Sequence, residues 1–220
     1  FVWDDTRTFD TGKVMTAAEL EAGKDFGRYK DVDGDGIPWR TLPGTHPTKG
    51  SFFTRGTTRN PYAQYSERGQ DYIYNMERLL RKFDPAANLV PQPVLRDAKE
   101  KTPYGVIYFG STSPAMREAL DVLEEEGIHL DAMRLQAFPF PESVNRFIAE
   151  HDKVFVAEQN RDGQMRYMLI NELDVDPARL IRVLHYDGTP ITARFIVNTI
   201  RKNVERVIKA APVSGSKELV

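Results

Sequence analysis

The sequence predicts an α/β protein built on a parallel sheet, preceded by an extended loop-rich segment and one helix. From Tyr104 onward, short apolar runs alternate with segments of helical spacing, which is the pattern of βαβ units. Upstream, 37 residues from Tyr29 to Tyr65 are rich in Gly, Pro and Thr. Loops of this length are usually functional or disordered. Because this one also carries aromatic and basic residues, we interpret it as an ordered loop that serves a site.

The first strand and helix of the α/β unit have clear signals at both ends. Gly105–Phe109 (GVIYF) reads as a buried strand. Ser113 is expected to be the N-cap of the next helix and Pro114 its first residue. This helix is expected to end at Gly127. Its last turn contains glutamates 124–126, which the helix dipole disfavours, so we expect them to be solvated and paired elsewhere.

The remaining elements follow the same alternation. Prolines close the second strand, and Thr192 is expected to cap the last helix. In order, the expected elements are a strand Ala132–Phe138, a helix from Pro141 to His151, a strand Lys153–Glu158, a helix Met165–Glu172, a strand Ile181–Tyr186 and a helix containing Ile196, Ile200 and Val204.

The N-terminal third offers little that could form a core alone. It contains a short predicted helix, Ala17–Ala22, and an amphipathic one, Asp71–Phe83. We therefore expect this third to pack on something else. The predicted organisation is a loop-rich segment over 1–83, a linker over 84–102, an α/β domain over 103–211 and a flexible tail over 212–220.

The composition excludes several classes of site and partner. Lys and Arg number 30 against 32 Asp and Glu, which gives no reason to expect nucleic acid or an anionic membrane as partner. The chain has no cysteine, so it cannot supply a disulfide, a thiol nucleophile or iron–sulfur ligands. That is consistent with the cytoplasm. No apolar run reaches the roughly 20 residues of a membrane span, no signal peptide is evident, and the missing initiator methionine suggests a fragment.

An acidic turn, Asp31, Asp33 and Asp35 followed by Gly36, reproduces the first half of a calcium loop. Hard cations require several carboxylate oxygens around a sharp glycine turn. The second half does not match, because Leu42 stands where a bidentate glutamate is needed. An ordinary acidic turn is the favoured interpretation, and we assign no metal site.

Arg40 lies between two prolines in IPWRTLPGT, so its backbone is stiff. A guanidinium is a natural two-pronged partner of a carboxylate or phosphate. Taken singly, each basic residue here is more simply a surface salt-bridge partner. As a cluster they favour recognition of an anion; its other candidate donors are Thr45, Thr48, Lys49, Ser51, Arg55 and Arg59.

Two further positions lie where strands of the α/β unit end. Gly110, Ser111 and Thr112 offer free backbone N–H groups at a strand-to-helix junction, which is a generic anion site or simply a tight turn. Glu158 ends another strand and Asn160 follows it, at the edge where open sheets bind ligands or partners. A helix-capping or hydrogen-bonding role for Glu158, Asn160 and Gln164 is an equal alternative. The four histidines have no metal spacing and no triad order, and we assign no catalytic residue.

The loop and the helix after it resemble one family. RYKDVDGDGIPWRTLPGT, FFTRGT with NPYAQYSE, and DYIYNMERLLRKF are similar to the alpha subunit of 2-oxoacid:ferredoxin oxidoreductases. YFGSTSPAMREALDVLEEEGIHLDAMRLQAFPFP and KVFVAEQNRDGQMRYML resemble the transketolase C-terminal-like domain, a three-layer α/β fold, that closes that subunit. The resemblance covers nearly the whole chain, and it implies that 1–83 is the end of the pyrimidine-binding region.

The resemblance implies an enzyme that decarboxylates a 2-oxoacid, in the first instance 2-oxoglutarate. A more anionic substrate or a different 2-oxoacid, such as pyruvate, stays open. Electrons would pass through an iron–sulfur cluster to ferredoxin, and the acyl group to coenzyme A. Thiamine diphosphate and magnesium would lie between this subunit and a beta subunit, and none of these groups is expected on this chain alone.

By the same resemblance, Arg40 matches an arginine that holds the substrate carboxylate, with Ser51 and Thr48 as further substrate contacts. Arg55, Arg59 and the two strand-end groups are candidate anion or partner contacts. The sequence departs from the family around His46-Pro47, where the loop is about two residues longer, and this makes the match of Ser51 insecure.

The pyrimidine-binding core and its YPITP-like loop are absent from the sequence, so we expect a C-terminal part of an alpha subunit that is inactive alone. Two alternatives remain open. One is a non-catalytic α/β domain that docks subunits, and the other is a calcium-stabilised module.

Overall fold

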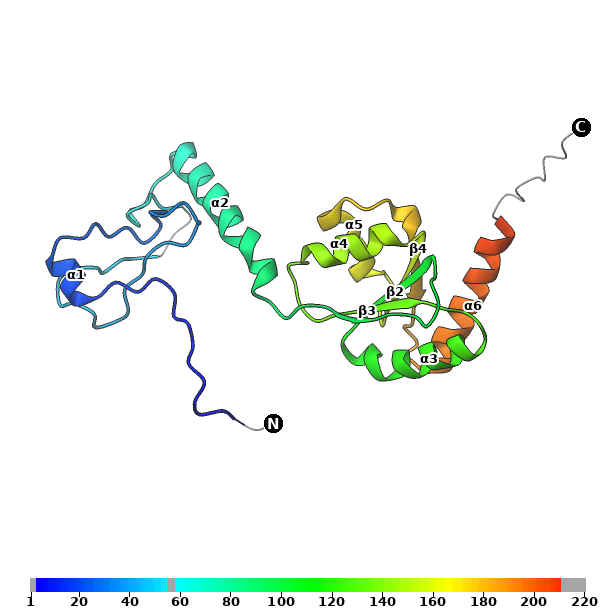
Figure 1. The fold of residues 1–220 in the computed structure, drawn as a ribbon. Helices are drawn as coiled ribbons and strands as arrows, with labels where there is room; N and C mark the ends of the chain where they lie inside the picture. Colours follow the sequence, from blue (N-terminus) through cyan, green and yellow to red (C-terminus); the bar gives the residue numbers. More distant parts are fainter. Residues whose placement is uncertain (1–2, 55–57, 211–220) are drawn as a thin grey trace, which may run out of the picture. The chain divides into compact units, whose positions relative to one another are not determined.

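The computed structural model describes residues 3–54 and 58–210, and it divides the chain into two compact units, Phe1–Ala86 and Ala87–Val220 (Figure 1). The predicted tail over 212–220 lies outside the described residues, as does Arg55. The second unit is a five-stranded sheet with helices on both faces, and the first is built of irregular chain and two helices.

The sheet of the second unit is parallel except at one edge. Its strand order is β1-β3-β2-β4-β5, in which β1 alone runs antiparallel to its neighbour, β3. After β3 the chain crosses to the other side of β2, so the carboxyl ends of β2 and β4 lie next to each other. The strands are β1 (Val94–Arg96), β2 (Tyr104–Phe109), β3 (Asp131–Leu135), β4 (Lys153–Glu158) and β5 (Leu180–Leu184).

Each face of the sheet is covered by two helices (Figure 1). α3 (Ser113–Glu125) and α6 (Ala193–Ala210) cover one face, and their core includes Phe155 of β4. α4 (Glu142–Glu150) and α5 (Gln164–Leu173) cover the other, around a second apolar core. Central strands that are buried on both faces read as continuous apolar runs, as β2 and β4 do. The predicted three-layer α/β class is confirmed.

Gly105 allows α4 to approach the sheet closely. A Cβ atom at this position would lie 2.8 Å from the ring of Phe147. His151, which follows α4, is held in the same place because its Nδ1 donates to the carbonyl of Phe147 at 2.6 Å and its Nε2 lies 3.0 Å from the Asp131 carboxylate. The end of α4 is therefore tied to the start of β3.

The segment 84–102, predicted to be a linker, contains a strand of the sheet. It begins with the 3₁₀ turn η1 (Asp84–Asn88) and includes β1, which pairs with β3 from Val94 to Arg96. Three residues flanked by prolines carry too little local signal to predict a strand. β1 forms because the outer edge of β3 offers unpaired backbone groups, which favour pairing.

Three predicted boundaries were wrong, each for a reason outside the local sequence. β3 ends at Leu135 and not Phe138, because its partner strand β2 ends there. β5 likewise ends at Leu184, opposite Glu158, and not at Tyr186. Ser113 is not the N-cap of α3. It is the first helical residue, because the 3₁₀ turn η2 (Gly110–Thr112) leads straight into the helix, and its N–H donates to the Gly110 carbonyl.

The first unit contains α1 (Ala17–Glu21) and α2 (Gly69–Phe83). α1 begins with a capping box: the Glu19 N–H donates to the Thr16 hydroxyl, and the Thr16 N–H donates to the Glu19 carboxylate at 2.8 Å. Lys24 adds an ion pair to Glu19 at 2.7 Å. Hydrogen bonds from Lys24 and then from Thr16 lower the pKa of Glu19 to about 2.

We expect the capping of α1 to weaken on acidification. The folded-state pKa of Glu19 lies below its ordinary 4.5, so its contribution to stability is fully present above pH 4.5 and is lost as the pH falls towards about 2. A carboxyl-carbon NMR titration should show Glu19 titrating near pH 2, and Lys24→Met should move it upward. A wild-type Glu19 that titrates at an ordinary pH would contradict this prediction.

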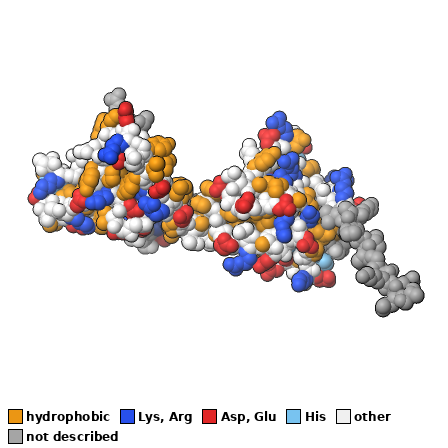
Figure 2. Space-filling view, turned by 90° about the horizontal axis from the view of Figure 1, so that it is seen from above, with side chains coloured by type: hydrophobic (Ala, Val, Ile, Leu, Met, Phe, Trp, Pro, Cys, Tyr) orange, Lys and Arg blue, Asp and Glu red, His pale blue; other side chains and the backbone are white. Residues whose placement is uncertain are grey.

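The apolar stripe of α2 faces away from its own unit. On this helix Arg78 is the buried residue, with 5% of its surface exposed, whereas Ile73 and Leu80 are 56% and 67% exposed. Hydrophobic side chains lie among Lys and Arg on the surface of this unit (Figure 2). The periodicity correctly identified an amphipathic helix. The surroundings within the first unit bury the polar side and leave the apolar side uncovered.

Candidate functional site

The acidic turn rests directly on α2. Gly36 has a φ of +76°, and a Cβ atom there would lie 2.5 Å from the Arg78 carbonyl and from the Lys82 N–H nitrogen. Arg78 Nη1 donates to the Gly36 carbonyl at 3.0 Å. The Asp31 N–H also donates to the Tyr74 hydroxyl of α2 at 2.7 Å. The loop backbone is thus fixed on the helix by close contact and by hydrogen bonds.

The three aspartates of this turn already have cationic or backbone partners. Lys13 Nζ lies 2.6 Å from the Asp33 carboxylate and 2.7 Å from that of Asp35. Asp31 pairs with Arg81 at 3.2 Å and accepts from backbone N–H groups within the turn. Hydrogen bonds from Lys13, and then from the Ile37 N–H, hold the pKa of Asp35 below its ordinary value. This arrangement fits an acidic turn cross-linked by a lysine.

Arg40 is held by its backbone beside residues 11–15. Its N–H donates to the Lys13 carbonyl at 2.9 Å, and its carbonyl accepts from Met15 at 2.8 Å. The half-buried side chain donates through Nη2 to the Thr11 carbonyl, while its buried Nε has no partner among the described residues. One end of the guanidinium is therefore fixed and part of its donor capacity is unused.

Arg40 lines a cavity of about 410 Å³ within the first unit, which we call the basic cavity. Ligand pockets commonly have volumes of about 300–1,000 Å³. Among the described residues that line it, Asp10 is the only acidic one, against five basic ones. The remaining walls come from residues 11–12, Tyr29, Ile37, Pro38 and Leu79, and the basic residues are Lys13, Arg28, Arg40, Arg78 and Lys82.

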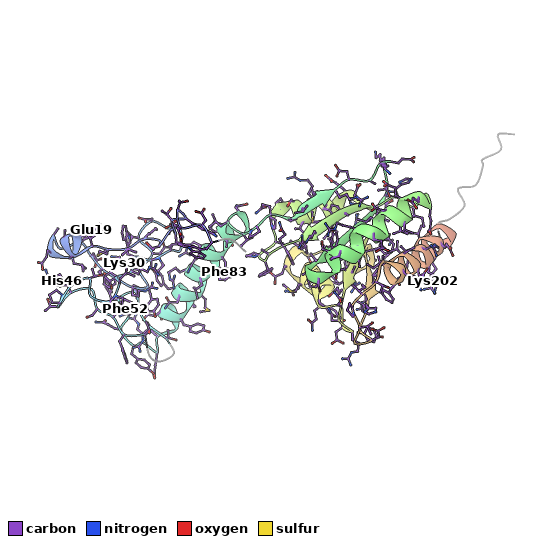
Figure 3. All side chains as sticks on the ribbon, turned by 90° about the horizontal axis from the view of Figure 1, so that it is seen from below. Glu19, Lys30, His46, Phe52, Phe83 and Lys202 are labelled. Carbon is purple, nitrogen blue, oxygen red and sulfur yellow. The ribbon has the colours of Figure 1, made fainter. Side chains whose placement is uncertain are left out.

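Ser51 and Thr48 are not part of the basic cavity. Ser51 lines a separate cavity of about 270 Å³, formed by residues 41–46 and 49–52. The Thr48 side chain is exposed, and its N–H donates to His46 Nδ1 at 3.1 Å. His46 Nε2 in turn contacts Glu21, which places the imidazole against the end of α1 (Figure 3). Among the cavities of the described residues, Arg40 and Ser51 therefore line two different ones.

Arg59 lies among aromatic rings. Its guanidinium is 5.9 Å from the ring centroid of Phe53 and 5.7 Å from that of Tyr65. It lines a smaller cavity of about 180 Å³ beside α2, which Arg78 also lines. The predicted anion contact of Arg59 stays a prediction; the described contacts are cation–π interactions.

Glu158 and Asn160 hold the first turn of α5 through their side chains. Glu158 is fully buried, and its carboxylate accepts from the N–H groups of Met165 and Arg166 at 2.8 and 3.0 Å and from the Asn160 amide at 2.8 Å. Asn160 Oδ1 accepts from three N–H groups of the same turn. These contacts support the capping alternative. The predicted partner contact of Glu158 and Asn160 stays a prediction, and no part of Glu158 is exposed in this chain.

Gly110, Ser111 and Thr112 form a tight turn at the end of β2. Gly110 has a φ of +57°, and Thr112 is buried. Gln159, from the end of β4, donates to the Ser111 hydroxyl at 3.0 Å and to that of Thr112 at 3.3 Å. The turn thus connects two neighbouring strand ends, and its predicted anion contact is supported by no further feature of the described residues.

No family model matches this chain. The chain is 25% identical over 186 residues to 2-oxoacid:ferredoxin oxidoreductase 2, subunit alpha, of Aeropyrum pernix, which is 82% of this chain and 28% of that protein. The predicted resemblance to this kind of alpha subunit is confirmed. The chain spans less than a third of the relative's length.

Solved structures of this kind of enzyme are also similar. The 2-oxoglutarate:ferredoxin oxidoreductase of Magnetococcus marinus, solved with 2-oxoglutarate, coenzyme A and succinyl-CoA, matches 83% of this chain and 31% of its own at a TM-score of 0.72 and 23% identity. This likeness establishes the shared fold. The alpha chain of a probable 2-oxoacid ferredoxin oxidoreductase from Thermoplasma acidophilum matches 52% of this chain and 97% of its own, at 23% identity and a TM-score of 0.36.

The donor set does not fit the inorganic groups expected of the complete oxidoreductase. The chain has no cysteine for an iron–sulfur cluster. Among residues 3–54 and 58–210, no group of three or more His, Asp or Glu is placed to hold a metal ion. These residues therefore supply no ligand set for a cluster or a metal.

None of the helices in residues 3–54 and 58–210 is both long enough and apolar enough to cross a membrane.

Sequence reasoning missed three residues that line the basic cavity of this chain. Arg28, Arg78 and Lys82 lie outside the motif around Arg40 and were given no role. A partial signal was present, because Arg78 and Lys82 are one turn apart on the polar side of an amphipathic helix. Their convergence with Arg40 depends on the loop that crosses α2 at Gly36.

Proposed function

We propose that this chain is part of the alpha subunit of a 2-oxoacid:ferredoxin oxidoreductase and that Arg40 binds the carboxylate of the 2-oxoacid. The observation that carries the proposal is the place of Arg40 in the basic cavity, with its Nε unpaired. A guanidinium fixed at one end loses little entropy when a carboxylate binds to its remaining donors.

The proposed role of this chain is binding and orientation. The 2-oxoacid carboxylate would supply the acceptor that Arg40 lacks, and the surrounding cations would strengthen the attraction between the carboxylate and the cavity. Thiamine diphosphate supplies the decarboxylation chemistry of such an enzyme. The complete complex that we propose is cytoplasmic. It also contains magnesium, an iron–sulfur cluster and the beta subunit, and it uses coenzyme A and ferredoxin. 2-Oxoglutarate is the first choice of substrate.

The test is Arg40→Ala in the assembled alpha–beta complex. We expect the KM for the 2-oxoacid to rise about 10- to 100-fold, because a charge-assisted hydrogen bond to a carboxylate contributes about 1.5–3 kcal/mol. Steady-state kinetics would measure the change, and size-exclusion chromatography would confirm assembly. Arg68→Ala is the matched control, since Arg68 is exposed and lines none of the three cavities of the first unit described above.

A docking domain without a substrate role is the second candidate. The exposed apolar residues of α2, which include Tyr72, Ile73, Leu80 and Phe83, favour it. The same experiment separates the two functions. Unchanged kinetics in an intact Arg40→Ala complex would eliminate the substrate role and favour docking.

A further inference from the structure

Two guanidinium groups in the basic cavity have a buried donor without an acceptor. Arg40 Nε and Arg78 Nε are both buried, and neither has a hydrogen-bond partner among the described residues. Both residues line the same cavity of about 410 Å³. A buried donor without a partner is costly, and most such groups in folded proteins are satisfied. Two unsatisfied guanidinium donors in one cavity therefore indicate two positions for acceptors.

The cavity also has an excess of positive charge. Arg28, Arg40, Arg78 and Lys82 form no ion pair with any carboxylate of the described residues. Lys13 is already paired with two aspartates, and Asp10 accepts from the Gly12 N–H at 2.7 Å. Burial lowers the pKa of Arg78, and the nearby charge of Arg28 acts in the same direction. A single negative charge would leave most of this excess uncompensated.

Arg78 is held in position for such a role. Its Nη1 donates to the Gly36 carbonyl at 3.0 Å, and its guanidinium lies 5.8 Å from the ring centroid of Tyr29. Gly36 in turn contacts the α2 backbone so closely that it has no room for a side chain. The side chain is thus anchored through one nitrogen, while its buried Nε has no acceptor among the described residues, as is the case for Arg40.

We propose that the basic cavity selects a dianionic 2-oxoacid, with Arg78 binding the acidic group at the end distant from the carboxylate held by Arg40. The inference rests on the proposed function and deepens it, because it assigns a specificity-determining residue to the same cavity. The substrate class is a 2-oxo dicarboxylate. An apolar 2-oxoacid of the same chain length would leave the Arg78 donor unsatisfied, and sites with such buried donors discriminate strongly.

The test compares two substrates in the assembled alpha–beta complex. 2-Oxoglutarate carries the second carboxylate, and 2-oxopentanoate has the same five-carbon chain with a methyl end. In the wild-type complex we expect kcat/KM to favour 2-oxoglutarate. Arg78→Met should lower the 2-oxoglutarate to 2-oxopentanoate ratio of kcat/KM about 10- to 100-fold, with little change for 2-oxopentanoate. Arg40→Ala should lower kcat/KM for both substrates by a similar factor and leave their ratio unchanged.

Each result supports or overturns the proposal. A wild-type preference for 2-oxopentanoate overturns it, as does an Arg78→Met complex with an unchanged ratio. If Arg78→Met does not assemble, Arg78→Lys keeps the charge but removes the guanidinium donors, and an unchanged ratio in that variant also overturns it. A different result would overturn the proposed function itself. That result is an Arg40→Ala complex in which kcat/KM is unchanged for both substrates, whatever the Arg78 variants show.

Discussion

Phe155→Ala is expected to destabilise the α/β unit by about 3–5 kcal/mol, the usual cost of truncating a buried phenylalanine. Phe155 is fully buried in β4, where it pairs with Val106 of β2 on one side and with Ile181 of β5 on the other. It belongs to the core beneath α3 and α6. Removing the ring takes away apolar burial and leaves a cavity that close-packed neighbours fill only partly.

Urea unfolding, monitored through amide hydrogen exchange in β2 and β4, would measure this loss of stability for the second unit alone. Tyr186→Ala is the control, because Tyr186 is 63% exposed and should cost under about 1 kcal/mol. If the two variants lose equal stability, Phe155 is not at the centre of the core.

Glu158→Ala is expected to destabilise the same unit by about 2–4 kcal/mol. The carboxylate accepts three hydrogen bonds, two of them from the first turn of α5, and its removal leaves buried donors unsatisfied. A negative charge at a helix N-terminus is also stabilised by the helix dipole. Relief of the desolvation of this buried charge offsets part of the loss.

The control for Glu158 is Asp162→Ala in the same turn. Asp162 is half exposed and its carboxylate pairs with Arg161 at 2.7 Å, an exposed ion pair that contributes about 0–1 kcal/mol. Hydrogen exchange of the Met165 and Arg166 amides should accelerate in the Glu158 variant and change little in the control. Equal protection in both variants would show that Glu158 is not the cap of α5.

The sequence predicted most of the α/β unit because its signals are local. β2 and β4 are continuous apolar runs, and Pro and Gly separate the elements, so their order followed directly. Strand ends were less accurate, since β3 and β5 end where their neighbours end. β1 was missed because its three residues are a strand only through pairing with β3.

The candidate site was predictable only in part. Arg40 was identified from its stiff motif, and it does line a cavity with other cations. Ser51 was expected beside it but lines a different cavity, because the chain after Pro43 turns towards α1. Sequence spacing gives no measure of where a long irregular loop brings its side chains.

The sequence by itself determined the three-layer unit, the amphipathic character of α2 and the stiff backbone around Arg40. Each depends on periodicity or on local backbone restriction, which neighbouring residues impose on one another. Only the tertiary structure decided that α2 turns Arg78 inward and that Arg28, Arg78 and Lys82 share a cavity with Arg40. Those outcomes depend on contacts between segments about 40 residues apart, such as Gly36 with Arg78, which no local pattern records.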